Sequence, residues 1–185
     1  ERAFMSVLYV CAGGAESFEN AFNCGIGLIN ASINLSKFLA TQKHLPQKLV
    51  FIGTCGLYDK SKELFSIIKS QNATNIEISA LLNLSYSPII SAQNKQNSAI
   101  NSSNFICKDL NISKKFSQIN LVAENMEFYA VCEVAKAFNL ECEGVFCASN
   151  YCENNAHEQF LANHAKAIEI LKNYLEQENE KYFRF

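Results

Sequence analysis

Arginine is nearly missing from this chain. Of its 185 residues only Arg2 and Arg184 are arginines, and both stand at the ends. The planar guanidinium group is the side chain that clamps a phosphate through two parallel hydrogen bonds. The body of the chain therefore cannot build an internal guanidinium clamp for phosphate.

Clustered positive charge and long apolar runs are missing as well. The 16 Lys and Arg residues are spread along the chain, and the formal net charge is -2 with a pI near 6.0. Nucleic-acid-binding domains usually carry a basic patch or stripe, so we expect no nucleic acid partner. No apolar run approaches the roughly 20 residues of a membrane span, and no basic segment leads into a long apolar one near the N-terminus. We expect no membrane partner and a cytoplasmic location.

Cysteine is plentiful, but the spacings typical of metal sites are absent. The chain has eight cysteines without a CxxC pair, and none of its three histidines stands two or three residues from a cysteine. Structural zinc sites usually draw their ligands from such close pairs. Several of the cysteines lie inside apolar runs, where a reduced thiol packs as a small hydrophobic group. We predict reduced thiols and no metal site.

The length and the 49% hydrophobic content suit one core, so we expect a single domain over residues 1–185. Met5 is the expected natural start, which would make residues 1–4 an addition. Helical periodicity marks residues 28–39, 127–138 and 156–178, and short apolar runs typical of strands alternate with these helices. The pattern predicts an α/β fold with three layers, in which helices cover a central mixed, twisted sheet. The C-terminal helix is expected only to pack, and His157 and His164 on it receive no role.

One stretch organises the polar residues. Glu124-Asn125-Met126-Glu127 follows an apolar run at 119–123 and precedes a helix over 127–138. A further apolar run at 144–148 then ends in Ser149-Asn150. If this is a strand-helix-strand crossover that returns beside the first strand, Glu127 and Asn150 share one edge of the sheet. A ligand crevice is expected there.

This pattern resembles the purine nucleoside phosphorylase and methylthioadenosine nucleosidase superfamily, which has an acidic-Met-Glu turn, a helix and a Ser-Asp pair. Met126 and Glu127 match, but the aspartate is replaced by Asn150. The resemblance implies a nucleoside phosphorylase-like fold and the cleavage of a purine nucleoside. It further implies that Glu127 holds the ribose hydroxyls, that Met126 lies against the sugar, and that Ser149 and Asn150 serve the base near N7.

The replacement by Asn150 changes the expected base. An amide carries no titratable proton for N7, but it donates one hydrogen bond and accepts another, which suits a 6-oxopurine such as that of inosine. Ser149-Asn150-Tyr151 is similar to the Ser-Asn-Tyr sequence of futalosine hydrolases, and trimeric purine nucleoside phosphorylases also have an asparagine. A 6-oxopurine is therefore favoured over adenine.

The same resemblance supplies further candidates. Glu16 falls on the glutamate that activates water in the nucleosidase branch, although such a residue by itself is also typical of a solvated loop. A buried strand at 48–52 is expected to end in a turn at 53–57 that resembles the family's Gly-Ser-x-Gly, which makes Thr54 a candidate contact. An ordinary strand-to-loop turn is the alternative. Phe105, next to Ile106, matches a stacking Phe, with a core aromatic as the alternative.

Three functions remain open. The shortage of arginine favours water as the nucleophile, and thus a hydrolase without a cofactor. A phosphorylase is the alternative, with phosphate as co-substrate held by lysines, backbone or a partner's terminus, although Phe51 stands where hexameric phosphorylases have an arginine. A non-catalytic nucleoside-binding homologue is the second alternative, because Asn150 and the bulky Phe128 and Tyr129 depart from the family pattern. By resemblance we expect a homo-oligomer, most simply a dimer, with the site near the subunit contact.

Overall fold

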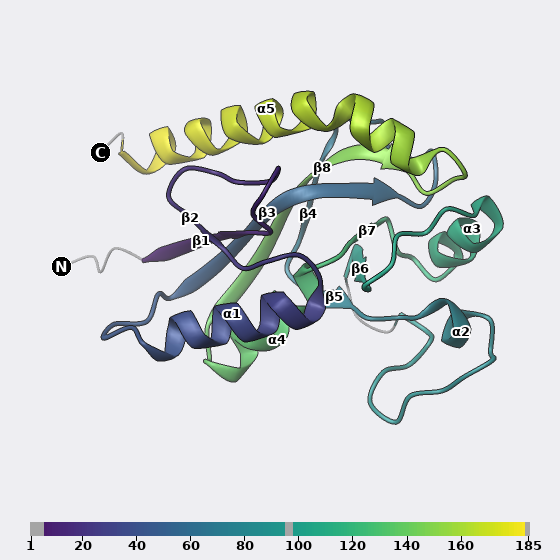
Figure 1. Ribbon diagram of the computed structural model, residues 1–185, viewed down its shortest axis with the longest axis horizontal. Coiled ribbons are helices and arrows are strands. Elements are labelled where there is room, and N and C mark those ends of the chain that lie inside the picture. Colours follow the sequence, from purple (N-terminus) through teal and green to yellow (C-terminus); the bar gives the residue numbers. More distant parts are fainter. Residues whose placement is uncertain (1–5, 95–97, 184–185) are drawn as a thin grey trace.

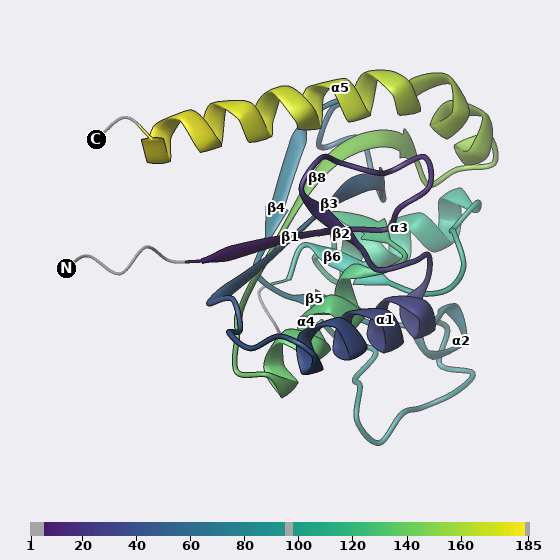
Figure 2. The same ribbon diagram turned by 60° about the vertical axis from the view of Figure 1, so that its left-hand side comes forward.

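A single mixed sheet lies between two layers of helices in the computed structural model, which describes residues 6–94 and 98–183. The expectations for residues 1–5, and both arginines, lie outside the described residues. On one face of the eight-stranded sheet lie α1 (Leu28–Ala40) and α4 (Phe128–Ala137), and on the other lies α5 (Ala156–Phe183) (Figures 1 and 2). The predicted three-layer α/β/α class is confirmed, and the helix predicted over 28–39 differs from α1 by one residue.

Two long parallel strands form the centre of the sheet, and shorter strands extend it on both sides. The strands are β1 (Val7–Cys11), β2 (Ala21–Asn23), β3 (Lys48–Leu57), β4 (Ile67–Ser70), β5 (Ala73–Thr74), β6 (Ile100–Ser102), β7 (Ala123–Asn125) and β8 (Glu141–Tyr151). The central pair is β3 and β8; β1 and β2 continue in parallel from β3, and β4 is antiparallel to β8. The short helices α2 (Ile78–Leu81) and α3 (Leu110–Gln118) lie near the β5–β7 end (Figure 1).

The turn predicted at 53–57 is wrong, because β3 continues through it. All five residues pair with β8, with one irregularity between Cys55 and Gly56. A Cβ atom on Gly53 would lie 2.8 Å from Oε2 of Glu16, and one on Gly56 would lie 2.8 Å from Nδ2 of Asn150. The small residues therefore make room for two side chains that lie across the strand, and they do not end it.

The predicted strand-helix-strand crossover is also wrong in its topology. Only residues 123–125 form the first strand, and β7 runs antiparallel to β3, whereas β8 runs parallel to β3. Gly56 pairs with Glu124 on one side and with Asn150 on the other. A strand has one neighbour on each side, so β8 does not return beside β7. The two polar ends nevertheless converge, because both flank the end of β3.

A cluster of three phenylalanines fixes the start of α4. Phe51, Phe128 and Phe146 are fully buried, and their ring centroids lie 5.2 to 6.1 Å apart. Burying each such ring contributes roughly 2–3 kcal/mol of hydrophobic free energy. Phe128 therefore packs into the core beside Glu127, and its bulk does not project toward the polar edge of the sheet.

The other helix layer packs through smaller side chains. Ala167, Ile168 and Leu171 of α5 are buried against a core cluster that includes Ile52 and Cys147.

All eight cysteines are free thiols. Within the described ranges no helix is both long and apolar enough to cross a bilayer.

Candidate active site

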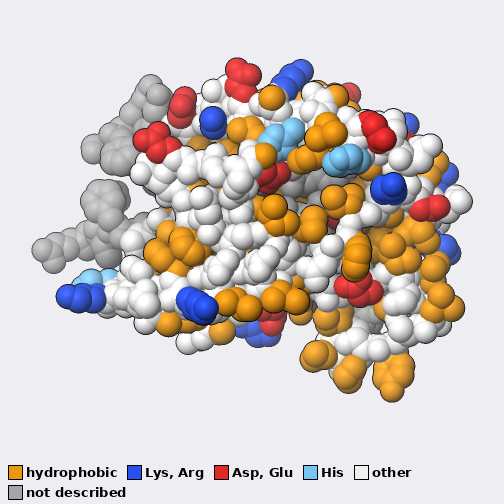
Figure 3. Space-filling model, in the orientation of Figure 1, with side chains coloured by type: hydrophobic (Ala, Val, Ile, Leu, Met, Phe, Trp, Pro, Cys, Tyr) orange, Lys and Arg blue, Asp and Glu red, His pale blue; other side chains and the backbone are white. Residues whose placement is uncertain are grey.

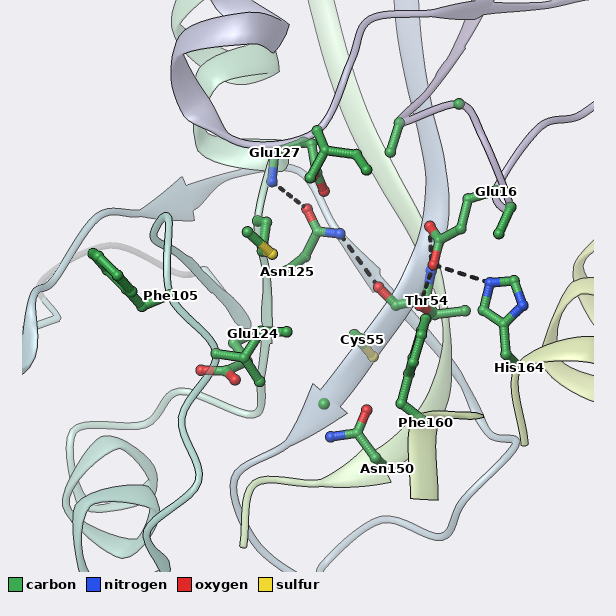
Figure 4. Close-up of a pocket in the computed structure, with 17 residues that line it drawn as sticks. Glu16, Thr54, Cys55, Phe105, Glu124, Asn125, Glu127, Asn150, Phe160 and His164 are labelled. Atoms are coloured by element: carbon green, nitrogen blue, oxygen red, sulfur yellow. Dashed lines mark hydrogen bonds and ion pairs between the residues drawn. The ribbon is translucent and has the colours of Figure 1, made fainter. Parts of the chain in front are cut away.

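A cavity of about 310 Å³ lies at the C-terminal end of β3, between α5 and the loops around α1 and α4. Its walls come from segments far apart in the sequence, which Figure 4 shows meeting around the end of β3. The side chains with polar or charged groups are those of Glu16, Thr54, Glu124, Asn125, Glu127, Asn150 and His164. The larger apolar ones are those of Ile26, Phe105, Ile106, Met126 and Phe160.

Glu16 is held at one side of the cavity by Thr54. The Thr54 hydroxyl donates to Oε1 of Glu16, and the Thr54 backbone N–H donates to Oε2 at 3.2 Å. Nε2 of His164 lies 3.6 Å from the same Oε1 and, in the part of the chain that the structure describes, is a buried atom without a hydrogen-bond partner. Glu16, Thr54 and His164 thus form one cluster from the β1–β2 loop, β3 and α5 (Figure 4).

The presence of His164 and Phe160 corrects the expectation that α5 only packs. Their side chains line the cavity, and their rings lie 4.8 Å apart between centroids. Helical periodicity identifies which residues share a face of α5 but not what that face meets. The seven-residue spacing of His157 and His164 carried no signal that one of them approaches Glu16.

Glu127 is a buried carboxyl group at the start of α4. Its Oε1 accepts the Gly27 backbone N–H at 2.9 Å, and only 4% of the residue is exposed. Burial raises the pKa of Glu127 to about 7, and the negative charge of Glu16 adds to the rise. The group can therefore exist in both protonation states near neutral pH.

Asn125 connects this carboxyl group to β3. Its Oδ1 accepts the backbone N–H groups of Glu127 and Phe128 at 2.8 and 2.9 Å, and so caps the start of α4. Its Nδ2 donates to the Thr54 carbonyl at 3.3 Å. Asn125 lines the cavity and was not among the predicted site residues. An asparagine just before a periodic apolar segment is a helix-start signal that could have found it.

Asn150 is held from behind by Ser149. The Ser149 hydroxyl lies 2.9 Å from Oδ1 of Asn150, and Nδ2 of Asn150 donates to the Tyr151 carbonyl at 3.2 Å. Asn150 lines the cavity, whereas Ser149 is fully buried and does not. Ser149, expected to contact substrate, instead orients the amide that does face the cavity.

Glu124 also lines the cavity, and the motif analysis gave it no role. Its Oε1 accepts the Cys107 backbone N–H at 2.8 Å, and its Oε2 accepts the Tyr58 hydroxyl at 3.1 Å. Burial raises the pKa of Glu124 to about 7. A charged residue directly after the apolar run at 119–123 is the sequence signal that could have singled it out.

The remaining candidates lie at the rim. Phe105 is 77% exposed and Ile106 is 53% exposed, and both line the cavity from the loop after β6. Phe105 is therefore not a core aromatic. Met126 lines the cavity beside Glu127.

The cavity is rich in carboxyl groups. Glu16, Glu124 and Glu127 line it, and no lysine or arginine does so among the residues that the structure describes. His164 supplies an imidazole beside Glu16. No group of three or more His, Cys, Asp or Glu residues that could hold a metal ion occurs within residues 6–94 and 98–183. The arrangement is suited to a ligand or transition state with positive charge.

The chain was compared with known proteins. No protein-family model matches the sequence, and no curated protein sequence matches it. Among solved structures, a mutant Helicobacter pylori methylthioadenosine nucleosidase with 5′-methylthioadenosine in its active site is similar at a TM-score of 0.76 and 15% identity, covering 97% of this chain and 100% of that one.

Two further solved structures are similar to this chain over most of its length. Futalosine hydrolase of Helicobacter pylori is similar at a TM-score of 0.74 and 14% identity, covering 95% of this chain and 97% of that one. The S-adenosylhomocysteine nucleosidase of Streptococcus pyogenes, in complex with 5-methylthiotubericidin, reaches a TM-score of 0.69 at 12% identity, with 94% and 97% covered. The chain has the fold of these nucleosidases, and the resemblance noted from its motifs is confirmed at the level of fold.

Proposed function

We propose, from this shared fold and the charge of the cavity, that the protein hydrolyses the N-glycosidic bond of a purine nucleoside. The observation that carries the proposal is that three glutamates and no lysine or arginine line the cavity among the described residues. Such a cavity repels a phosphate anion and favours the positive charge that develops on the ribosyl centre. Water is therefore the proposed nucleophile, and phosphorolysis is the alternative that the test must address.

Glu127 is proposed to hold the ribose hydroxyls, with Met126 against the sugar. The Gly27 N–H fixes Oε1 of Glu127, so the carboxyl group is positioned before substrate enters. A preorganised negative charge next to the sugar costs no reorganisation when the ribosyl centre becomes positive. Because the pKa of Glu127 is about 7, this contribution grows as the pH rises through neutrality.

Glu16 is proposed to act as the general base. It would take a proton from the water molecule whose oxygen attacks C1′, while the C1′–N9 bond breaks and its electron pair passes to the base. Thr54 holds both oxygens of Glu16 and so fixes the direction of proton transfer. Nε2 of His164 lies 3.6 Å from Oε1 of Glu16 and places an imidazole beside this carboxyl group. The departing base takes its proton from solvent.

Asn150 is proposed to serve N7 of the base, and Phe105 and Ile106 to cover the base at the rim. The hydrogen bond from Nδ2 of Asn150 to the Tyr151 carbonyl uses one of the two amide hydrogens. The other can donate to the ring nitrogen on which negative charge develops. An amide that donates here without giving up a proton suits a 6-oxopurine such as hypoxanthine.

We further propose a homodimer and a reaction without a cofactor. Ile26, Ile29 and Ile33 are 46 to 66% exposed on one side of α1 and the turn before it, where Figure 3 shows hydrophobic side chains in a row. Ile26 also lines the cavity, so a second copy packed on this face would lie next to the site. Sedimentation at micromolar concentration tests the dimer, and turnover in the presence of a chelator tests the absence of a metal requirement.

The deciding experiment is base release from inosine and adenosine in phosphate-free buffer, with identification of the sugar product. Hydrolysis gives free ribose and does not respond to added phosphate. Release that requires phosphate and gives ribose 1-phosphate would replace the proposal by the phosphorylase alternative. Tight nucleoside binding without turnover would identify a binding protein.

A further inference from the structure

His164 is a cavity residue of α5 to which the proposed hydrolysis assigns no step. Its Nε2 atom is buried and, among the described residues, has no hydrogen-bond partner. A ring nitrogen that is buried and unpaired costs free energy, so its presence in a native structure calls for an explanation. The charged atom beside it is Oε1 of Glu16, at 3.6 Å.

The surroundings of His164 direct its ring toward this carboxyl group (Figure 4). Phe160, one helical turn earlier on α5, packs against the ring at 4.8 Å between centroids. The side chain of His164 is 15% exposed and that of Glu16 is 14% exposed. Water therefore competes little for the contact between them, and a hydrogen bond there is stronger than one on the surface.

Thr54 uses only part of the acceptor capacity of Glu16. The Thr54 hydroxyl donates to Oε1, and the Thr54 N–H donates to Oε2. Each carboxylate oxygen accepts about two hydrogen bonds, so one acceptor position is left on each. The backbone of Glu16 is fixed as well, because Gly13 and Glu16 exchange N–H···O bonds of 3.2 and 3.3 Å. The side chain thus lacks only one further donor on Oε1, where His164 lies.

We propose that His164 is a positioning residue for Glu16, and that its Nε2–H donates to Oε1. A carboxylate only accepts hydrogen bonds, and an unprotonated Nε2 would set its own lone pair against Oε1. The neutral tautomer with Nε2–H and the imidazolium ion both supply the donor, so the role does not depend on the charge of the ring. Hydrogen bonds in active sites often shorten when substrate enters, which brings the 3.6 Å separation into bonding range.

This contact gives the two oxygens of Glu16 different tasks. With the Thr54 hydroxyl and His164 on Oε1, both acceptor positions of that oxygen are filled. Oε2 keeps one position and takes the proton of water, while the water oxygen bonds to C1′ and the C1′–N9 electron pair passes to the base. Nε2 is buried, so His164 acts through Glu16. The inference rests on the proposed function in that it takes Glu16 as the general base.

A packing role for His164 makes a different prediction. A side chain that only fills space beside Phe160 can be replaced by another of similar size without loss of rate. Gln and Met are both unbranched and similar in length, but only Gln carries an N–H group near the position of Nε2. The comparison of these two replacements therefore separates hydrogen-bond donation from packing.

The first test is single-turnover base release from inosine or adenosine, whichever the unmodified protein cleaves faster. His164→Met should lower the rate roughly tenfold to a hundredfold, the effect of losing a hydrogen bond to a charged group, while nucleoside affinity stays unchanged. His164→Gln should retain most of the rate. The matched control is His157→Met, which removes an exposed histidine whose ring also lies beside Phe160. A His164→Met variant as fast as the unmodified protein, or a His164→Gln variant as slow as His164→Met, would overturn the inference.

A second measurement does not depend on activity. In protein labelled with ¹⁵N-histidine, the ring nitrogen shifts show which nitrogen carries a hydrogen, and His164→Gln identifies the signals of His164. At pH 8, above the ordinary pKa of histidine, we expect a protonated Nε2 whose shift changes in Glu16→Ala but not in Glu19→Ala.

The two measurements also separate this inference from the proposed function. A His164 ring protonated only at Nδ1 would overturn the inference even in an active hydrolase. A protonated Nε2 that responds to Glu16→Ala, in a protein that releases no base from any nucleoside, would support the hydrogen bond while the proposed hydrolysis fails.

Discussion

The two ends of the cavity differ in how far their side chains match the nucleosidase superfamily. At the end proposed to bind the sugar, the Gly27 N–H binds Glu127, and the N–H and hydroxyl of Thr54 bind Glu16. At the end proposed to bind the base, Asn150 lines the cavity, and the Cys107 N–H and the Tyr58 hydroxyl bind Glu124. The sugar end matches the motif of the nucleosidase superfamily, whereas the base end departs from it at Asn150. From this comparison we expect substitutions of Glu16 and Glu127 to alter the turnover rate. We expect substitution of Asn150 to alter the choice of base.

The largest expected effect is at Glu16. Glu16→Gln should lower turnover roughly 10² to 10⁴-fold, the range typical of a general base, while inosine affinity stays nearly unchanged. Single-turnover kinetics and calorimetric binding measure the two quantities separately. Glu19→Gln, an exposed carboxylate close by in the sequence, is the matched control. A fall in affinity as large as the fall in turnover would remove Glu16 from proton transfer.

Glu127→Gln should lower turnover roughly 10² to 10³-fold, the effect typical of removing an electrostatic stabiliser. The shape is kept and the negative charge near the ribosyl centre is lost. Steady-state turnover of the best nucleoside is the measurement, with Glu133→Gln as control. An unchanged rate would show that this carboxyl group takes no part in the chemistry.

The buried carboxyl groups should also make stability depend on pH. The pKa of Glu127 is about 7 in the folded protein, against 4.5 for an exposed glutamate. Between these values the folded state holds a proton that the unfolded chain has released, so the free energy of unfolding falls as pH rises from about 4.5 to about 7. The loss should be on the order of 3 kcal/mol. Urea unfolding at pH 5 and pH 8 measures it.

The variant Glu127→Gln should reduce this pH dependence, because a neutral amide does not titrate. Glu124→Gln should do the same, since the pKa of Glu124 is also about 7. Full retention of the difference between pH 5 and pH 8 in both variants would contradict the raised pKa values.

The smallest expected effect lies at the base end. Asn150→Asp places a protonatable carboxyl near N7 and should shift relative turnover toward adenosine over inosine by roughly tenfold to a hundredfold. Competing-substrate assays measure the ratio directly. Asn173→Asp, on an exposed position of α5, is the control. An unaltered preference would show that this amide does not read the base.

The sequence predicted three of the five helices that the structure describes, missed α2 and α3, and placed the ends of strands less well. Apolar spacing alone placed helices over 28–39 and 127–138, close to α1 and α4. It ended β3 at Ile52, five residues early, because Gly53 and Gly56 look like a turn when their neighbours are unknown. Their role became visible only with Glu16 and Asn150 in place across the strand.

Seven of the site residues predicted from the motifs line one cavity in the structure: Glu16, Thr54, Phe105, Ile106, Met126, Glu127 and Asn150. It misplaced Ser149, which lies behind the cavity wall. It missed His164, Phe160, Glu124 and Asn125. The first two stand on a helix whose inward face could meet either core or cavity, and no local pattern distinguishes these cases.

By itself the sequence determined the local features: the three long helical segments, the chemical character of the Glu124–Glu127 stretch, and the lack of arginine for a phosphate clamp. These depend on residues close together along the chain. The tertiary structure alone decided that Glu124 and Asn150 flank Gly56, that His164 approaches Glu16, and that burial raises the pKa values of Glu124 and Glu127 to about 7. Strand neighbours and desolvation depend on contacts between distant segments, and no local pattern encodes them.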